Sequence, residues 1–147
     1  MIDLAGPTGP WVHDVQRSSL NQLLASVESV DGMLRCFDGR RMATLDGLFR
    51  EYVREFSFPE YFGWNWPAFD ECMTDLEWLP AKRYLTIVEH ADDLLQEEPG
   101  ELPTYLRQLA DIGRHWSRAF ALGPGWGGGE VPYHTVLVHS EQVRPQS

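Results

Sequence analysis

The segment 84–88, Tyr-Leu-Thr-Ile-Val, constrains the fold more than any other part of the chain. It is apolar throughout and rich in β-branched residues, as are strands that lie in the middle of a sheet and are buried on both faces. Segments with helical periodicity precede and follow it. Strands separated by helices pair in parallel through right-handed crossovers, so we expect an α/β protein with a parallel sheet.

Apolar spacing and capping residues place the other elements. Thr44 is a candidate N-cap for a strongly amphipathic helix, and Asn65 is a candidate N-cap for the next helix. Pro67 fits the first turn of that second helix, where backbone N–H groups are unpaired. The predicted order is an N-terminal helix followed by β-α-α-β-α-α-β. Strands are expected over 33–37, 84–88 and about 133–139, helices over about 17–29, 45–56, from 66 to a stop at 79–80, 91–96 and 102–120, and an irregular arm over 1–13.

The charge of the chain limits the partners that it can have. With 22 acidic and 12 basic residues, the formal net charge is -10. Neutralising phosphate groups requires surplus lysine and arginine, so direct nucleic-acid binding is not expected. An acidic protein attracts basic partners instead, and its field accelerates their encounter. At 147 residues the chain is long enough for one domain with its own apolar core, and we expect a monomer when it is free.

The two cysteines, Cys36 and Cys72, each lie within an apolar stretch. We therefore expect two reduced thiols in the core rather than a disulfide. No segment approaches the length of a membrane-spanning helix, and the N-terminus lacks the basic start and apolar run of a signal peptide. A cytoplasmic protein without membrane contact is expected.

Residues 58–72 combine aromatic rings and carboxylates where a loop runs into a helix, and they contain no lysine or arginine. Such a surface suits the imitation of a flat, anionic ligand, such as nucleic acid, in front of a basic partner. Within this segment, Tyr61 and Trp64 are candidates for an exposed anchor pair, with core packing as the alternative. Trp66 and Phe69 are expected to pack at least partly inward.

The remaining patterns favour structure over chemistry. The five histidines show no metal-ligand spacing, and no nucleophile–base pattern is present, so we expect no catalytic residue, metal or cofactor. Residues 123–128 fit G-x-G-x-x-G, but they follow a helix and precede a strand, the reverse of a dinucleotide-binding loop. An ordinary connection is expected there, with a partner contact at Trp126 as the weaker hypothesis. On pattern alone, a solvated helix face is expected at Asp70, Glu71, Asp75 and Glu77.

With this order of elements, the acidic and aromatic segment resembles the barstar family of intracellular ribonuclease inhibitors. The resemblance runs from about 33 to 140 and is most specific between Asp38 and Pro80. It implies a barstar-like three-stranded parallel sheet flanked by helices over 33–140, an N-terminal extension with one helix over 1–32, and a flexible tail over 141–147. The residues that match the motif of the family are Pro59, Glu60, Tyr61, Gly63, Asn65, Ala68, Cys72 and Thr74.

Members of this family present the loop and the helix after it to the basic active site of a ribonuclease, with carboxylates where RNA phosphates would lie. The resemblance places Glu71 at the dominant contact aspartate and Asp70 at a contact tryptophan. Pro67 replaces a second contact aspartate, so that charge is missing. Together with the anchor pair, the implied partner-binding residues are Tyr61, Gly63, Trp64, Asn65, Trp66, Asp70, Glu71 and Asp111.

These observations predict a non-enzymatic inhibitor that blocks the active site of a basic ribonuclease or nuclease toxin, with a target other than barnase favoured by the changed charges. The alternative is a regulatory or scaffold domain that has kept the fold and binds another protein through Trp64 and Trp66. An enzyme that uses the acidic loop is disfavoured, because no nucleophile, base pair or cofactor motif accompanies the carboxylates.

Overall fold

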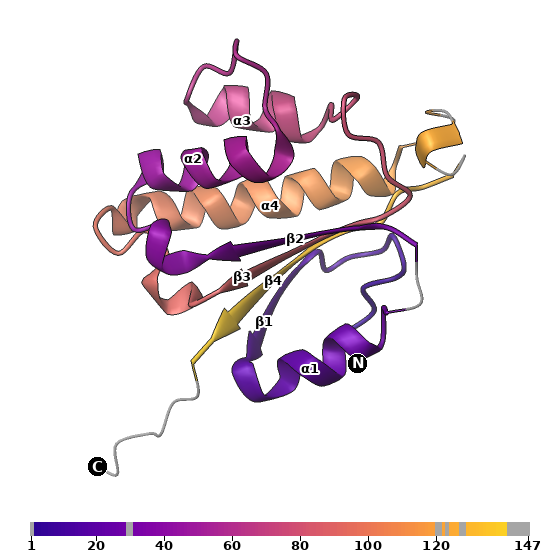
Figure 1. Ribbon diagram of the computed structural model, residues 1–147, viewed down its shortest axis with the longest axis horizontal. Coiled ribbons are helices and arrows are strands. Elements are labelled where there is room, and N and C mark those ends of the chain that lie inside the picture. Colours follow the sequence, from indigo (N-terminus) through magenta and orange to yellow (C-terminus); the bar gives the residue numbers. More distant parts are fainter. Residues whose placement is uncertain (1, 29–30, 120–121, 123, 127–128, 141–147) are drawn as a thin grey trace.

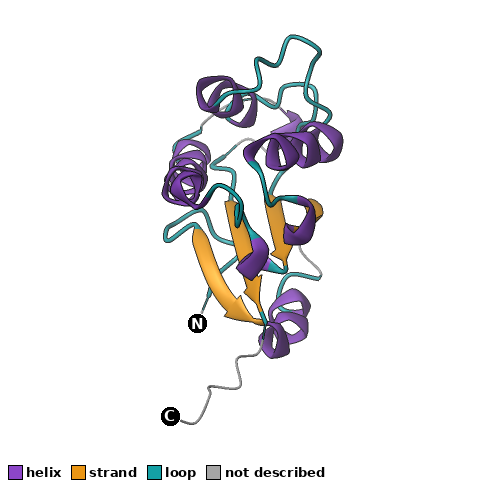
Figure 2. Ribbon diagram, turned by 90° about the vertical axis from the view of Figure 1, so that its left-hand side faces the viewer, coloured by secondary structure: helices purple, strands orange, loops and turns teal. Residues whose placement is uncertain are grey.

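The computed structural model describes residues 2–28, 31–119, 122, 124–126 and 129–140. A single parallel sheet lies between helices on its two faces (Figures 1 and 2). The strand order is β1-β4-β3-β2, with β1 at Val12–Gln16, β2 at Met33–Asp38, β3 at Tyr84–Glu89 and β4 at Tyr133–His139. One side carries α2 (Leu45–Phe56), α3 (Trp66–Met73) and α4 (Leu102–Ser117), and the other carries α1 (Leu20–Ala25).

The sheet has four strands where three were predicted, because the N-terminal segment contributes β1. This strand pairs in parallel with β4, from Val12 opposite Thr135 to Gln16 opposite His139. Residues 12 and 13 had been expected in an irregular arm. The strand has only five residues, and a pattern this short is weak. Its partner strand begins more than 100 residues later, and this distant pairing decides its structure.

Several helices are shorter than predicted. The N-terminal helix is reduced to α1, preceded by a 3₁₀ turn at Arg17–Ser19, and the helix expected over 91–96 is a 3₁₀ turn at Ala91–Asp93. α3 ends at Met73, well before the expected stop at 79–80, and the chain then takes a left-handed conformation at Leu76, with φ of 47°. α4 ends at Ser117; residue 120, its predicted end, and the predicted tail over 141–147 lie outside the described residues.

Both predicted helix caps are confirmed. The Thr44 hydroxyl accepts a hydrogen bond from the Gly47 backbone N–H at 3.0 Å, at the start of α2. The Asn65 side-chain oxygen accepts one from the Ala68 N–H at 2.8 Å, at the start of α3. Each cap pairs an N–H group that has no partner within its helix, so both helices begin where the sequence predicts.

Two apolar cores lie on opposite faces of the sheet. The larger core fills the space between the sheet and α2, α3 and α4, and its aromatic centre includes Phe69, which contacts Phe49 and Tyr52. The smaller core lies under α1 and is built from Leu4, Val15, Val27, Leu85, Ile87, Val136 and Val138. β3 and β4 are therefore covered on both faces, as their apolar sequences predict.

The prediction of two core thiols is half wrong. Cys72 is buried in the larger core, whereas Cys36 is exposed, and both are free thiols. Cys36 lies on β2, which is an edge strand of the sheet, and Leu34 two residues earlier is also exposed (47%). Alternate residues of a strand share a face, so the outer face of this edge strand is open. Apolar neighbours in the sequence do not reveal that a strand lies at an edge.

A candidate partner-binding face

The loop between α2 and α3 is held by its own buried aromatic residues. Phe58 and Phe62 are buried in the larger core, and the Phe62 N–H donates to the Pro59 carbonyl at 3.0 Å, which closes a turn. Tyr61, which lies between these two anchors, is 71% exposed, and Trp64, which follows them, is 46% exposed. Of the two alternatives that the sequence left open for this pair, the structure shows exposure rather than core packing.

Trp64 has an unusual backbone. Its φ is 54°, a left-handed conformation that costs a residue with a side chain about 1 kcal/mol or more. The indole packs on Phe62, with ring centroids 5.5 Å apart, while its other parts remain exposed. Gly63 beside it is exposed and has open space around it, since an added Cβ would meet only the Asn65 amide at 3.4 Å and Ala68 at 3.5 Å.

Trp66 is fixed from several sides and packs partly inward, as predicted. Its ring meets Phe49 edge-on at 5.1 Å and stacks on Tyr105 of α4 at 6.2 Å. The indole N–H donates to the Glu101 carboxylate at 2.9 Å. Sequence reasoning missed Glu101, which lies in a 3₁₀ turn just before α4, because no local pattern links it to a residue 35 positions earlier.

Acidic side chains from α3 and from the segment after it act on the exposed tyrosine. Glu71 is exposed and Asp70 is half-buried. Desolvation raises the pKa of the Tyr61 phenol, and Cys72 and the carboxylates of Asp75, Glu71 and Glu77 raise it further. The tyrosine therefore shares one surface with these acids. No lysine or arginine occurs between Arg54 and Lys82, so the segment that forms this surface supplies no cationic side chain from either residue type.

Asp111 lies apart from the loop, on α4. Its carboxylate is exposed and accepts a hydrogen bond from the Arg114 guanidinium at 3.0 Å. A partner would have to compete with Arg114 for this group. Seven of the eight predicted residues thus lie in one continuous loop and helix, whereas Asp111 is already paired within its own helix.

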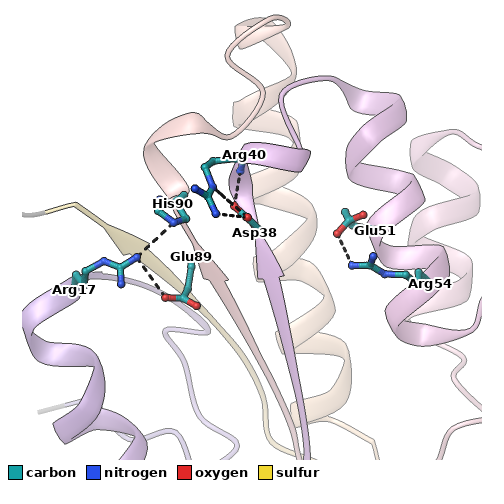
Figure 3. A network of polar contacts seen from close by, with 7 residues as sticks. All are labelled: Arg17, Asp38, Arg40, Glu51, Arg54, Glu89 and His90. Carbon is teal, nitrogen blue, oxygen red and sulfur yellow. Dashed lines mark hydrogen bonds and ion pairs between the residues drawn. The ribbon is translucent and has the colours of Figure 1, made fainter.

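The carboxyl ends of parallel strands often bind ligands in α/β proteins, but here they are joined by internal contacts (Figure 3). The Asp38 carboxylate, at the end of β2, accepts from the Arg40 guanidinium at 2.8 Å. This hydrogen bond lowers the pKa of Asp38 to about 2. The Arg17 guanidinium lies 3.6 Å from the Glu89 carboxylate and 3.5 Å from the His90 ring, across to β3. The polar side chains at the carboxyl ends of these strands therefore pair with one another.

A comparison with protein families identifies the family of the chain. The family model described as Barstar (barnase inhibitor) matches residues 33–124, more than half of the sequence. The chain belongs to the barstar family. The matched range contains α2, α3, α4 and the whole candidate face, whereas β1, α1 and β4 lie outside it. No curated protein matches the chain.

Members of the barstar family are inhibitors rather than enzymes. Pro67 is exposed in the first turn of α3, so this position carries no charge. Within the described residues, no group of three or more histidine, cysteine or acidic side chains is arranged to hold a metal ion. The described helices also include none that is long and apolar enough to cross a membrane.

The glycine-rich loop after α4 gives little support to a second contact patch. Trp126 is half-buried and packs against the larger core. It lies in a 3₁₀ turn at Pro124–Trp126, between α4 and β4, as expected for a connection rather than a nucleotide-binding loop. Residues 123, 127 and 128 lie outside the described part of the chain.

Proposed function

We propose that this protein is an inhibitor that binds and blocks the active site of a basic ribonuclease or related nuclease toxin, and so protects the cytoplasm of the cell that makes both. The observation that carries the proposal is the acidic and aromatic surface formed by Tyr61, Trp64 and Glu71 within the part of the chain that matches the barstar family. Carboxylates on this surface would take the places of substrate phosphates in the partner.

The rigidity of the face supports tight binding. Phe62 anchors the loop, the Asn65 cap fixes the start of α3, and the bond from Trp66 to Glu101 holds the first indole of the helix. Side chains that are already ordered lose little conformational entropy when a partner binds. Close charge pairs across such an interface contribute roughly 1.5–7 kcal/mol each, a range measured on the barnase–barstar pair itself.

The changed residues favour a partner other than barnase. Pro67 removes one contact charge, while Asp70 adds a carboxylate one turn before the end of α3 and Glu71 keeps a charge on a longer side chain. Moving charges in this way weakens binding to a partner whose basic groups match the contact charges of barstar. We therefore expect a basic nuclease whose cationic groups face Asp70 and Glu71.

The test is capture of the partner from the native host by the wild-type protein, followed by a nuclease assay. The captured protein is expected to be a basic nuclease whose cleavage of RNA or DNA stops when the inhibitor is added in equal amount. The double variant Asp70→Ala with Glu71→Ala should bind at least about 30-fold more weakly, the loss expected from removing a paired interfacial charge.

A matched control removes the same two charges elsewhere. Glu28 and Asp31 are both exposed and lie between α1, on the other face of the sheet, and β2, so the variant Glu28→Ala with Asp31→Ala should keep nearly full affinity. Unchanged affinity of the Asp70/Glu71 variant for the captured nuclease would show that inhibition does not use this face.

The scaffold alternative makes a different prediction. Trp64 is exposed, but Trp66 is half-buried and its N–H is already bonded, so an apolar partner would dock mainly on Trp64. In that case Trp64→Ala would abolish capture, the captured protein would lack nuclease activity, and its association rate would change little with salt.

A further inference from the structure

Two histidines of β4 join this strand to β1 at its two ends. Near the start of β4, the Nδ1 atom of His134 lies 2.9 Å from Nε2 of His13. At the end of β4, the Nε2 atom of His139 lies 2.7 Å from an Asp14 carboxylate oxygen. His13 is buried and Asp14 is exposed, and adjacent strand residues point to opposite faces, so the two contacts lie on opposite sides of the sheet.

The first contact requires at least one neutral ring, and its surroundings show where a neutral His134 carries its proton. Its Nε2 atom lies 2.7 Å from the Gly6 carbonyl oxygen, which can only accept, so this nitrogen carries the proton and donates. Nδ1 is then the unprotonated nitrogen, and it accepts from the His13 Nε2–H. One added proton leaves the bond in place, because the other ring is neutral and can accept through its free nitrogen; protonation of both rings would place two N–H donors against each other and break the bond.

The charged groups around this pair do not reverse that requirement. Burial lowers the pKa of His13 to about 4, with His134 as a further cause, and Asp14 opposes the shift. Burial also lowers the pKa of His134; the bond to Gly6 and the charge of Asp3 oppose this, and Arg83 adds to it. Both rings therefore resist protonation in the folded protein.

The second contact requires a protonated His139. Its Nδ1 atom lies 2.7 Å from an Asp92 carboxylate oxygen, while Nε2 faces Asp14 at the same distance. Ionised carboxylates only accept hydrogen bonds, so both ring nitrogens must carry protons. Burial opposes the positive charge, but the bonds to Asp92 and Asp14 outweigh it and raise the pKa of His139. The Ser140 N–H also donates to Asp92 and holds this carboxylate in place.

We propose that these contacts form a pH-operated clasp, which strengthens the pairing of β1 with β4 while the His13–His134 pair keeps a neutral ring and His139 is protonated. The histidine pair contributes its full stability above the unfolded pKa of about 6.5 and loses it as the pH falls toward 4. His139 contributes fully below about 6.5 and loses its contribution as the pH rises through its raised folded value. The attachment of β1 is therefore strongest near neutral pH and weakens on both sides.

Opening the clasp would affect more than one strand. Leu4, which precedes β1, and Val15, which belongs to it, are both part of the smaller core. Trp11 packs against Gly113 of α4, and the Arg114 guanidinium lies 5.5 Å above its ring. Release of β1 therefore loosens one core and also removes a neighbour of the Arg114–Asp111 pair. None of this depends on the proposed inhibition of a nuclease.

Two measurements on the full chain test the clasp. Nitrogen NMR of the imidazole rings at neutral pH should find His139 protonated and His134 neutral with its proton on Nε2. Hydrogen exchange should follow the Thr135 amide, which donates to the Trp11 carbonyl at 2.9 Å and is freed when β1 leaves. Its protection factor is expected to fall roughly tenfold between about pH 7 and pH 5, while amides of the β2–β3 ladder change less.

Variants separate the two ends. With Thr135 protection measured above as well as below pH 7, His139→Gln should remove the alkaline loss and keep the acidic loss. His13→Gln should reduce the acidic loss, because the amide oxygen can accept from a protonated His134, and keep the alkaline loss. His115→Gln is the control, because His115 is exposed on α4 and is part of neither contact, and it should leave both losses unchanged. If either variant fails to fold, the wild-type measurements decide. A neutral His139 at pH 7, or a Thr135 profile that parallels the β2–β3 ladder, overturns the proposal.

Discussion

At the scale of single residues, Asn65 combines a structural and a proposed binding role. Its side chain caps α3, and it is exposed at the tip of the candidate face. The sequence predicts the cap because asparagine before a Trp-Pro helix start is a local signal that needs no tertiary information. Glu101 shows the opposite case, since its bond to Trp66 joins two segments that no local signal connects.

Removing the Asn65 cap should lower the free energy of unfolding, and an aspartate at the same position should not. Asn65→Ala is expected to reduce the free energy of unfolding by about 1 kcal/mol, because the Ala68 N–H loses its acceptor, whereas Asn65→Asp should keep the cap. Urea unfolding measures both. Thr44→Ala removes the equivalent cap of α2 and should cost a similar amount. If Asn65→Asp also weakens partner binding while stability is kept, the residue makes a direct contact.

At the scale of elements, the docking of the N-terminal segment on α4 depends on one glycine. A Cβ atom at Gly113 would lie 2.3 Å from the Trp11 Cβ and 2.4 Å from its Cγ, far inside contact distance. Periodicity predicts α2, α3 and α4, because each turns one apolar stripe toward the sheet. It does not predict which segment pairs with β4 at the edge of the sheet. β1 was missed for this reason, since its five residues gain their structure only by pairing with β4.

Gly113→Ala should therefore be destabilising, although the same change within an exposed helix stabilises by about 1 kcal/mol. We expect a loss of roughly 1–3 kcal/mol from overpacking against Trp11. In the background of Trp11→Gly, which removes the clashing atoms, Gly113→Ala should be neutral or stabilising. Gly100→Ala, with no atom within 4 Å of its added Cβ, is the control for the substitution itself. Equal effects of Gly113→Ala in both backgrounds would contradict the packing seen here.

At the scale of the whole molecule, the net charge of -10 acts on folding and on binding in opposite ways. Excess negative charge repels itself in the compact state, and the same field attracts a basic partner. Salt screens both effects, because the Debye length falls to about 10 Å at 0.1 M. The sign of each salt effect therefore distinguishes self-repulsion from partner steering.

Raising sodium chloride from about 10 mM to 300 mM should leave the melting temperature unchanged or higher, while the association rate with a basic nuclease falls by roughly tenfold or more. Calorimetry measures the first quantity and stopped-flow binding the second. An uncharged osmolyte of equal osmolarity is the control for effects that do not involve charge. An association rate insensitive to salt would favour apolar docking on Trp64 over the proposed inhibitor.

The sequence by itself determined the α/β class, three of the four strands and the starts of α2 and α3. These depend on periodicity, caps and turns, which are encoded within a few residues of each other. Only the tertiary structure decided the fourth strand, the exposure of Cys36, the bond that fixes Trp66 and the histidine contacts between β1 and β4. These arise where segments distant in sequence meet, and their energies come from pairing and burial that no local pattern records.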